Sequence, residues 1–207
     1  FDGMKIMQEE QYTCHMGQYP VIILSLKAAK QPNFQMAYEC LLEQIITEYK
    51  RHAYILDSDF ILQGDKDNYW AIMSRTAEPS AYATALAFLS ACLKKYYNKN
   101  SIILLDEYDV PLETAHFRGF YDEMVDFIRS LFESALKTND NLEFAVITGC
   151  LRISRESIFT GLNNLEVNSV LNDNFAEYFG FTPQEVENML DFYDINEKSD
   201  EVKHWYD

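Results

Sequence analysis

The sequence predicts an α/β fold with a mostly parallel sheet flanked by helices. Two observations carry this prediction. Short, almost wholly apolar runs recur along the 207 residues, and long amphipathic segments lie between them. Strands that alternate with helices form parallel sheets, because each helix returns the chain to the start of the next strand. A chain of this length also buries enough surface to fold without disulfides or metals.

The first half of the chain predicts one strand and two helices. The run VIILSL at 21–26 follows Pro20 and indicates a strand buried on both faces. Apolar residues at three- and four-residue spacing over 34–49 predict an amphipathic helix. Pro79 suits the first turn of a second, buried helix that continues through 81–93.

The segment between these two helices has a weaker pattern. Residues 53–78 predict short helices and loops, with a turn from Gly64 to Asn68.

The second half predicts two more strands around a long helix. The runs IILL at 102–105 and FAVIT at 144–148 indicate the strands, and apolar positions over 120–136 share one helix face. A short helix is expected around 156–159, and 167–171 is compatible with a further strand.

A strong local signal follows near the end of the chain. Residues 182–185, TPQE, combine a capping box with proline at the first helical position, so a helix begins there.

Charge and apolar runs restrict the partners. The chain has 17 Lys and Arg against 33 Asp and Glu, a net charge of −16. Such a chain repels phosphate backbones at long range, so we expect no direct nucleic-acid binding and no membrane binding. The apolar stretch 81–93 is too short to span a bilayer, and the N-terminus has no secretory pattern. The four cysteines form no CxxC pair, which is typical of reduced thiols and predicts a cytoplasmic protein.

Two acids follow the strand at 102–105 and are the clearest candidates for chemistry. Ligands of an open α/β sheet bind beyond the carboxyl ends of its strands, so Asp106 and Glu107 are delivered to that edge. The first acid can hold Mg²⁺, usually through water, and the second can orient an attacking water. A solvated turn is the alternative interpretation.

The next strand supplies three further candidates. Thr148 ends it and would lie beside the acid pair if the strands are neighbours, where its hydroxyl could position a water or sense a γ-phosphate. Arg152 and Arg155 follow closely and could contact phosphate. A good strand residue and two surface ion pairs are the ordinary interpretations.

Other kinds of catalytic site receive less support. A metal-dependent nuclease could use Glu107 and Asp109 on one strand face, but Pro111 makes continuation of the strand unfavourable. The four histidines are scattered, and neither G-x-S-x-G nor G-x-G-x-x-G occurs. Serine hydrolases and dinucleotide oxidoreductases are therefore not favoured.

The blocks DEYDVPL, TGCLRIS and ESIFTGLNN carry a family resemblance. With their flanking residues they resemble the predicted AAA-ATPase-like family of bacterial proteins, over nearly the whole chain from Tyr19 onward. The resemblance implies a P-loop NTPase core that uses Mg²⁺ and ATP. Asp106 then matches the Walker B aspartate that supports the metal, and Glu107 matches the acid that polarises the attacking water. Thr148 matches a sensor-like position, and Arg152 is the candidate for a phosphate contact.

One part of the family pattern is missing from these residues. A P-loop has the form G-x-x-x-x-G-K-[ST], and none of the seven glycines fits it. We therefore expect a core whose first strand and P-loop are absent from this chain. Residues 1–19 are expected as a lead-in segment, 20–181 as the Walker B half of the core, and 182–207 as the start of a C-terminal helical segment.

Two functions remain open from the sequence. The first is the central part of an ATPase that is inactive alone, binds no cofactor tightly and self-associates through exposed sheet edges. The second is a degenerate NTPase fold that serves as a protein-interaction module without hydrolysis. Whether this chain is an enzyme is thus undecided from the sequence alone.

Overall fold

The computed structural model of the chain describes residues 1–150, 158–159, 165–169, 171–172, 174–175 and 180–206. It forms two compact units, Phe1–Asn163 and Asn164–Asp207, and each is described by itself. The domain limits expected from the sequence, after residues 19 and 181, remain predictions.

The first unit is built on a three-stranded parallel sheet. Its strands are β1 (Val21–Ser25), β2 (Ser101–Asp106) and β3 (Leu142–Ile147), in the spatial order β1-β2-β3. The register aligns the middle of β1 with the middle of β2, and β2 in turn with β3. All three strands fall within a residue or two of their predicted positions. The predicted fold class, a parallel sheet flanked by helices, is confirmed.

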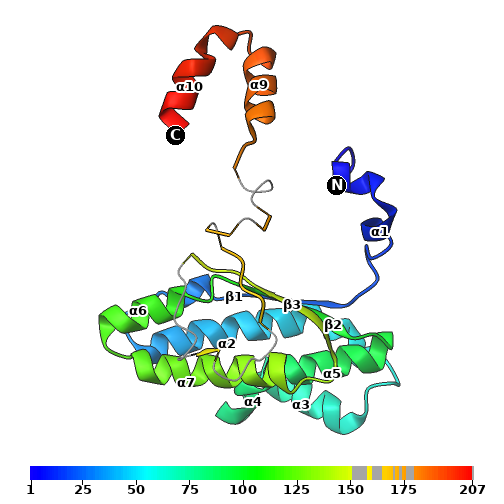
Figure 1. Ribbon diagram of the computed structural model, residues 1–207. Helices are drawn as coiled ribbons and strands as arrows, with labels where there is room; N and C mark the ends of the chain where they lie inside the picture. The colour runs from blue at the N-terminus through cyan, green and yellow to red at the C-terminus, as the bar shows by residue number, and fades with distance from the viewer. Residues whose placement is uncertain (151–157, 160–164, 170, 173, 176–179, 207) are drawn as a thin grey trace. The chain divides into compact units, whose positions relative to one another are not determined.

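Three long helices cover one face of this sheet. They are α2 (Phe34–Arg51), α5 (Ala85–Tyr97) and α7 (Tyr121–Phe132), which lie together beneath the strands in Figure 1. The strand residues that face them are fully buried: Ile22, Leu24, Ile103 and Leu105. The hydrophobic core therefore lies between the sheet and this helical layer.

The remaining elements of the first unit are shorter. The α-helices are α1 (Glu10–Thr13), α3 (Gln63–Met73), α4 (Pro79–Ala83) and α6 (Val110–Arg118). The single turns are η1 (Lys5–Gln8), η2 (Lys27–Ala29), η3 (Ala53–Asp57) and η4 (Glu133–Lys137).

Three sequence predictions need correction here. The turn expected from Gly64 to Asn68 is wrong, because those residues lie inside α3. The helix expected to run from Pro79 through 93 is broken at Thr84, which separates α4 from α5. The helix expected over 120–136 ends as α7 at Phe132 and continues as a π-helical turn, η4.

Two buried tyrosines join the helices of the core. The hydroxyl of Tyr49 donates to the carbonyl of Ala85 at 2.7 Å, and that of Tyr69 donates to the carbonyl of Tyr49 at 2.7 Å. Burial raises the pKa of both phenols, so they remain neutral donors. The carbonyls they reach lie at the break before α5 and at the end of α2.

The outer edge of β1 is closed by side chains of α2. The N–H of Ile102 donates to the carbonyl of Pro20, and the N–H of Leu26 donates to the carbonyl of Asp106. Alternate residues of β1 therefore direct their main-chain groups toward β2, and Val21 and Ile23, which lie between them, direct theirs away from it. Buried Glu48 accepts the N–H of Ile23 at 2.7 Å, and the Arg51 guanidinium donates to the carbonyl of Val21.

The side chains that close this edge also form further hydrogen bonds. Arg51 Nε donates to Glu48 Oε2 at 2.8 Å, and His52 Nε2 lies 3.2 Å from the Val21 carbonyl. Two of the main-chain groups that another strand would need at this edge, the N–H of Ile23 and the carbonyl of Val21, are therefore already bonded.

The outer edge of β3 differs from that of β1. Thr148, just past β3, donates its N–H to Leu105 of β2 and accepts the N–H of Tyr108, so alternation turns the main-chain groups of Ala145 and Ile147 outward. Within the described residues no hydrogen bond to these outward groups is present. This edge is open to strand addition.

The sheet face opposite the helices is apolar and accessible. Three of its residues, Ile23, Phe144 and Val146, are exposed by 49%, 61% and 40%. Large apolar side chains gathered on one sheet face normally pack against another element.

The second unit is helical where it is described. It comprises α9 (Pro183–Phe192), η6 (Asn196–Lys198) and α10 (Ser199–Tyr206). The predicted capping box is confirmed, because Thr182 Oγ1 accepts from the N–H of Glu185 and the Glu185 carboxylate accepts from the N–H of Thr182.

Two expected elements before α9 cannot be compared fully. Residues 167–169 form no strand, and residue 170 lies outside the described residues. Most of the short helix expected at 156–159 also lies outside them. In the part of the chain that the structure describes, no helix has both the length and the apolar character to cross a bilayer.

Candidate functional site

The carboxyl ends of β2 and β3 bring two sequence-predicted residues into contact. Asp106 is the last residue of β2, and Thr148 follows β3 directly. The hydroxyl of Thr148 donates to Asp106 Oδ1 at 2.5 Å. The expectation that Thr148 lies beside the acid pair is therefore correct, and a carboxylate and a hydroxyl share the open end of the sheet.

Glu107 leaves the strand in an uncommon backbone conformation. Its φ is +54°, in the left-handed region that a residue with a side chain rarely adopts. Its Oε1 lies 3.6 Å from the ammonium of Lys27, just past β1. Its Oε2 is buried and has no hydrogen-bond partner within the described residues. A buried carboxylate oxygen without a partner costs free energy, so Glu107 is held here at a cost to stability.

The turn after β3 packs on the residues that follow Glu107. Asp109 is buried, with 3% of its surface exposed, and its Oδ2 accepts the N–H of Cys150 at 3.0 Å. Tyr108 donates its N–H to the carbonyl of Thr148 at 3.1 Å. The chain segments after β2 and β3 are therefore joined by both main-chain and side-chain bonds.

The donor set determines which cation could bind. Asp106 supplies one exposed carboxylate, and no group of three or more His, Cys, Asp or Glu side chains among the described residues could hold a metal ion alone. Mg²⁺ in phosphate-transfer sites is commonly held by one or two carboxylates, with phosphate oxygens and waters completing the octahedron. The site therefore suits a Mg²⁺–phosphate complex better than a protein-only metal centre.

The nuclease alternative loses its geometric basis. It required Glu107 and Asp109 on one face of a continuing strand, but β2 ends at Asp106. Asp109 lies instead at the start of α6, which begins with Val110 and Pro111.

Two further candidates cannot be placed, and two neighbours were missed. Arg152 and Arg155 lie outside the described residues.

Ser25 is aligned with Asp106 in the sheet register, and Lys27 lies next to Glu107. Their position at the end of the apolar run 21–26 was the available signal, because neighbouring parallel strands end at the same edge.

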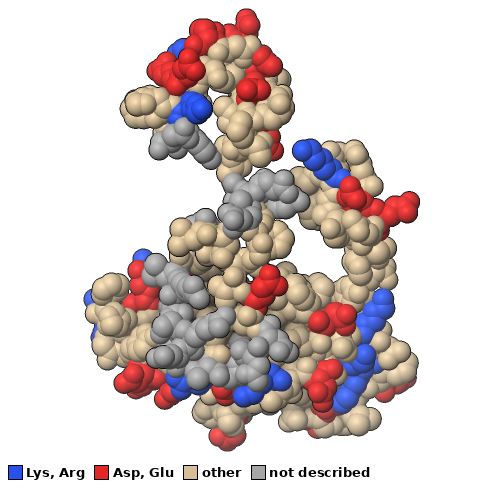
Figure 2. Space-filling model, viewed as in Figure 1, with Lys and Arg blue, Asp and Glu red and all other residues tan. Residues whose placement is uncertain are grey.

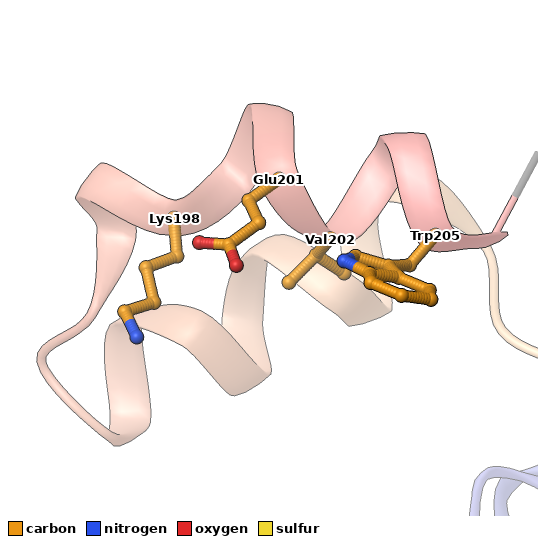
Figure 3. A pocket seen from close by; sticks show the side chains of 4 residues that line it. All are labelled: Lys198, Glu201, Val202 and Trp205. Atoms are coloured by element: carbon orange, nitrogen blue, oxygen red, sulfur yellow. The ribbon is translucent and has the colours of Figure 1, made fainter.

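Two surface hollows of the described residues lie away from this site. A shallow one in the second unit is lined by Lys198, Glu201, Val202 and Trp205, whose side chains lie along η6 and α10 in Figure 3. Another lies in the first unit between the 30–32 segment and α6. On the face shown in Figure 2, acidic side chains are widely spread and the described Lys and Arg side chains lie among them.

Comparison with protein families gives a decisive match. The model of the family described as "Predicted AAA-ATPase" matches residues 1–159, which include both strand ends of the site. The chain belongs to this predicted AAA-ATPase family.

Comparison with individual proteins adds little about activity. This AAA-ATPase-family chain is 29% identical over 106 residues to an "Uncharacterized protein in vnfD 5'region" of Azotobacter chroococcum mcd 1. The match covers 51% of this chain and spans about a fifth, 20%, of that relative's length. No solved structure matches the chain.

Proposed function

We propose that this chain supplies the Walker B half of a Mg-ATP hydrolysis site in a bacterial, cytoplasmic ATPase. In this proposal Asp106 supports Mg²⁺, Glu107 polarises the attacking water, Thr148 senses the γ-phosphate and Arg152 contacts phosphate. The contact between Thr148 and Asp106 carries the proposal, because it places a hydroxyl on the carboxylate at adjacent strand ends.

The order of the strands supports this assignment. In the P-loop sheet the first strand, which leads into the phosphate-binding loop, lies beside the strand that follows Walker B. In this chain that neighbour is β3, and its outer edge is open while the outer edge of β1 is closed. A first strand that lies outside these 207 residues would pair with β3 and bring its phosphate-binding loop to Asp106.

The residues already present have separate roles in such a site. Bound Mg²⁺ would neutralise charge on the transferred phosphoryl group. Asp106 would orient the metal through its carboxylate while Thr148 fixes the rotamer of that carboxylate through Oδ1. The carboxylate of Glu107 would accept a hydrogen bond from the water and direct it toward the phosphorus.

Hydrolysis assays test the proposal directly. The chain alone should show negligible ATP turnover, and the chain expressed with the coding segment upstream of Phe1 should show Mg²⁺-dependent turnover. Glu107→Gln should abolish that turnover, because an amide is a far weaker base than a carboxylate. Glu113→Gln is the matched control, since Glu113 is an exposed glutamate on α6.

The opposite result has a clear meaning. Full turnover in Glu107→Gln would exclude the proposed role of Glu107. Absence of turnover and of ATP binding in the longer polypeptide would instead favour a degenerate fold that acts as a protein-interaction module.

A further inference from the structure

The carboxylate of Asp109 serves the turn after β3 rather than its own helix. Asp109 is the N-cap residue of α6, a position where aspartate ordinarily accepts an N–H from the first turn of the helix. No such capping bond is present. Its Oδ2 instead accepts the N–H of Cys150, 41 residues further along the chain, at 3.0 Å.

The same turn is pressed against Asp109 at its glycine. A Cβ on Gly149 would lie 2.7 Å from Asp109 Oδ1 and 2.7 Å from Cε1 of Tyr108. Real Cβ atoms do not approach other heavy atoms so closely, so with any side chain at this position either the turn or the Asp109 and Tyr108 side chains must shift, which separates Asp109 from the turn. Glycine permits the contact that the carboxylate of Asp109 then holds.

Thr148 is the residue fixed by this arrangement. Its N–H donates to the carbonyl of Leu105 at 2.8 Å, and its carbonyl accepts the N–H of Tyr108 at 3.1 Å. The bond from Cys150 to Asp109 holds the chain two residues further on. With its main chain held on both sides, Thr148 directs its hydroxyl to Asp106.

We propose that Asp109 is a positioning residue that holds the Thr148–Cys150 turn against the end of β2 and so keeps the Thr148 hydroxyl on Asp106. Its effect on hydrolysis rests on the function proposed above, whereas its effect on the turn does not. A buried carboxylate also makes a stronger and shorter hydrogen bond to an N–H than a neutral acceptor makes, which suits a turn that must hold one position.

The turn can be tested on the 207-residue chain without nucleotide. Asp109→Ala removes the acceptor, so hydrogen exchange at the Cys150 amide should accelerate by roughly 10-fold or more, as expected when a bonded amide opens locally. The methyl NMR signal of Thr148 should shift with it. The amide of Ile103 in β2 is the internal reference and should keep its protection.

Two further variants separate positioning from general destabilisation. Asp109→Asn retains a side-chain oxygen acceptor and should restore slow exchange at Cys150. Gly149→Ala leaves Asp109 intact but separates it from the turn, so it should reproduce the exchange and methyl changes of Asp109→Ala. Unchanged exchange at Cys150 and an unshifted Thr148 methyl signal in both alanine variants would overturn the proposal.

The catalytic consequence is measured in the longer polypeptide. Asp109→Ala and Gly149→Ala should lower kcat about 10-fold with little change in KM for ATP, a loss typical of residues that orient a catalytic group. Asp109→Asn should recover most of kcat. Equal losses in Asp109→Asn and Asp109→Ala would exclude positioning through the hydrogen bond. Absence of hydrolysis in the unmodified protein would contradict the proposed function, and the exchange result would still decide the role of Asp109.

Discussion

Glu48 and Ile23 are joined by a hydrogen bond that a strand would ordinarily make with another strand. Oε1 of Glu48, on α2, accepts the N–H of Ile23 in β1 at 2.7 Å. Arg51 and His52 bond the same carboxylate and the carbonyl of Val21. One buried acid thus links the helical layer to the sheet edge.

Removing this acid should strongly destabilise the fold. Glu48→Leu leaves the N–H of Ile23 and the Arg51 guanidinium without their partner, and we expect it to lower the free energy of unfolding by about 3 kcal/mol. Glu48→Gln keeps an acceptor for Ile23 and should cost about 1 kcal/mol. Urea denaturation measures both, with exposed Glu123→Gln on α7 as the control. Equal stability of Glu48→Leu and the unmodified chain would contradict the structural role of Glu48.

The same carboxylate should make stability depend on pH. Burial raises the pKa of Glu48, but hydrogen bonds from His52, Arg51 and Ile23 outweigh it and hold the pKa below its ordinary 4.5. A carboxyl group whose pKa is lower in the folded state stabilises fully above its unfolded pKa, and loses that contribution as the pH falls through the folded pKa. The stability difference between the unmodified chain and Glu48→Gln should therefore shrink between neutral pH and about pH 3. A difference that is constant over this range would contradict the assignment.

Glu107 should show a conflict between stability and function. A side chain at φ +54° costs roughly 1–2 kcal/mol relative to glycine, and the buried Oε2 adds to that cost. Glu107→Gly should therefore raise the free energy of unfolding by about 1 kcal/mol, while ATP turnover is lost in the longer polypeptide. Glu107→Ala is the matched control, because it removes the carboxylate but keeps a Cβ at the strained position. Equal stability of the glycine and alanine variants would show that the backbone is not strained.

The open edge of β3 should govern self-association of the chain. Proline at Ala145 removes an N–H that faces outward, so Ala145→Pro should block strand addition and leave the β2–β3 ladder intact. We expect the unmodified 207-residue chain to form dimers in sedimentation velocity, and Ala145→Pro to shift them to monomer. Val146→Pro is the contrasting variant, because the main-chain N–H of Val146 points toward β2. Its loss should destabilise the sheet. Identical distributions for Ala145→Pro and the unmodified chain would exclude association through this edge.

The sequence predicted the parts of the fold that depend on local pattern. Apolar runs located all three strands, and the capping box located the start of α9 at Pro183. The contact between Thr148 and Asp106 followed from the rule that neighbouring parallel strands end at one edge. Gly64 was misinterpreted because glycine in the first turn of a helix costs little compared with glycine in the middle.

The missed features depend on tertiary contacts. Pro111 was interpreted as the end of a strand, although proline in the first turn of a helix is equally favourable, so α6 was not predicted. Asp109 is an ordinary N-cap residue by sequence, and only packing shows that its carboxylate reaches Cys150 instead. The closing of β1 by Glu48 joins residues 25 positions apart, which no periodicity reveals.

Because the two edges of the sheet differ, the chain can pair with one further strand. A sheet with two open edges can add neighbours without limit and grow into a fibre. Here Glu48, Arg51 and His52 block one side, so among the described residues each copy offers one sheet edge where a strand can join. Once that place is filled, by a strand of the same polypeptide or by a second copy, the assembly is closed and finite.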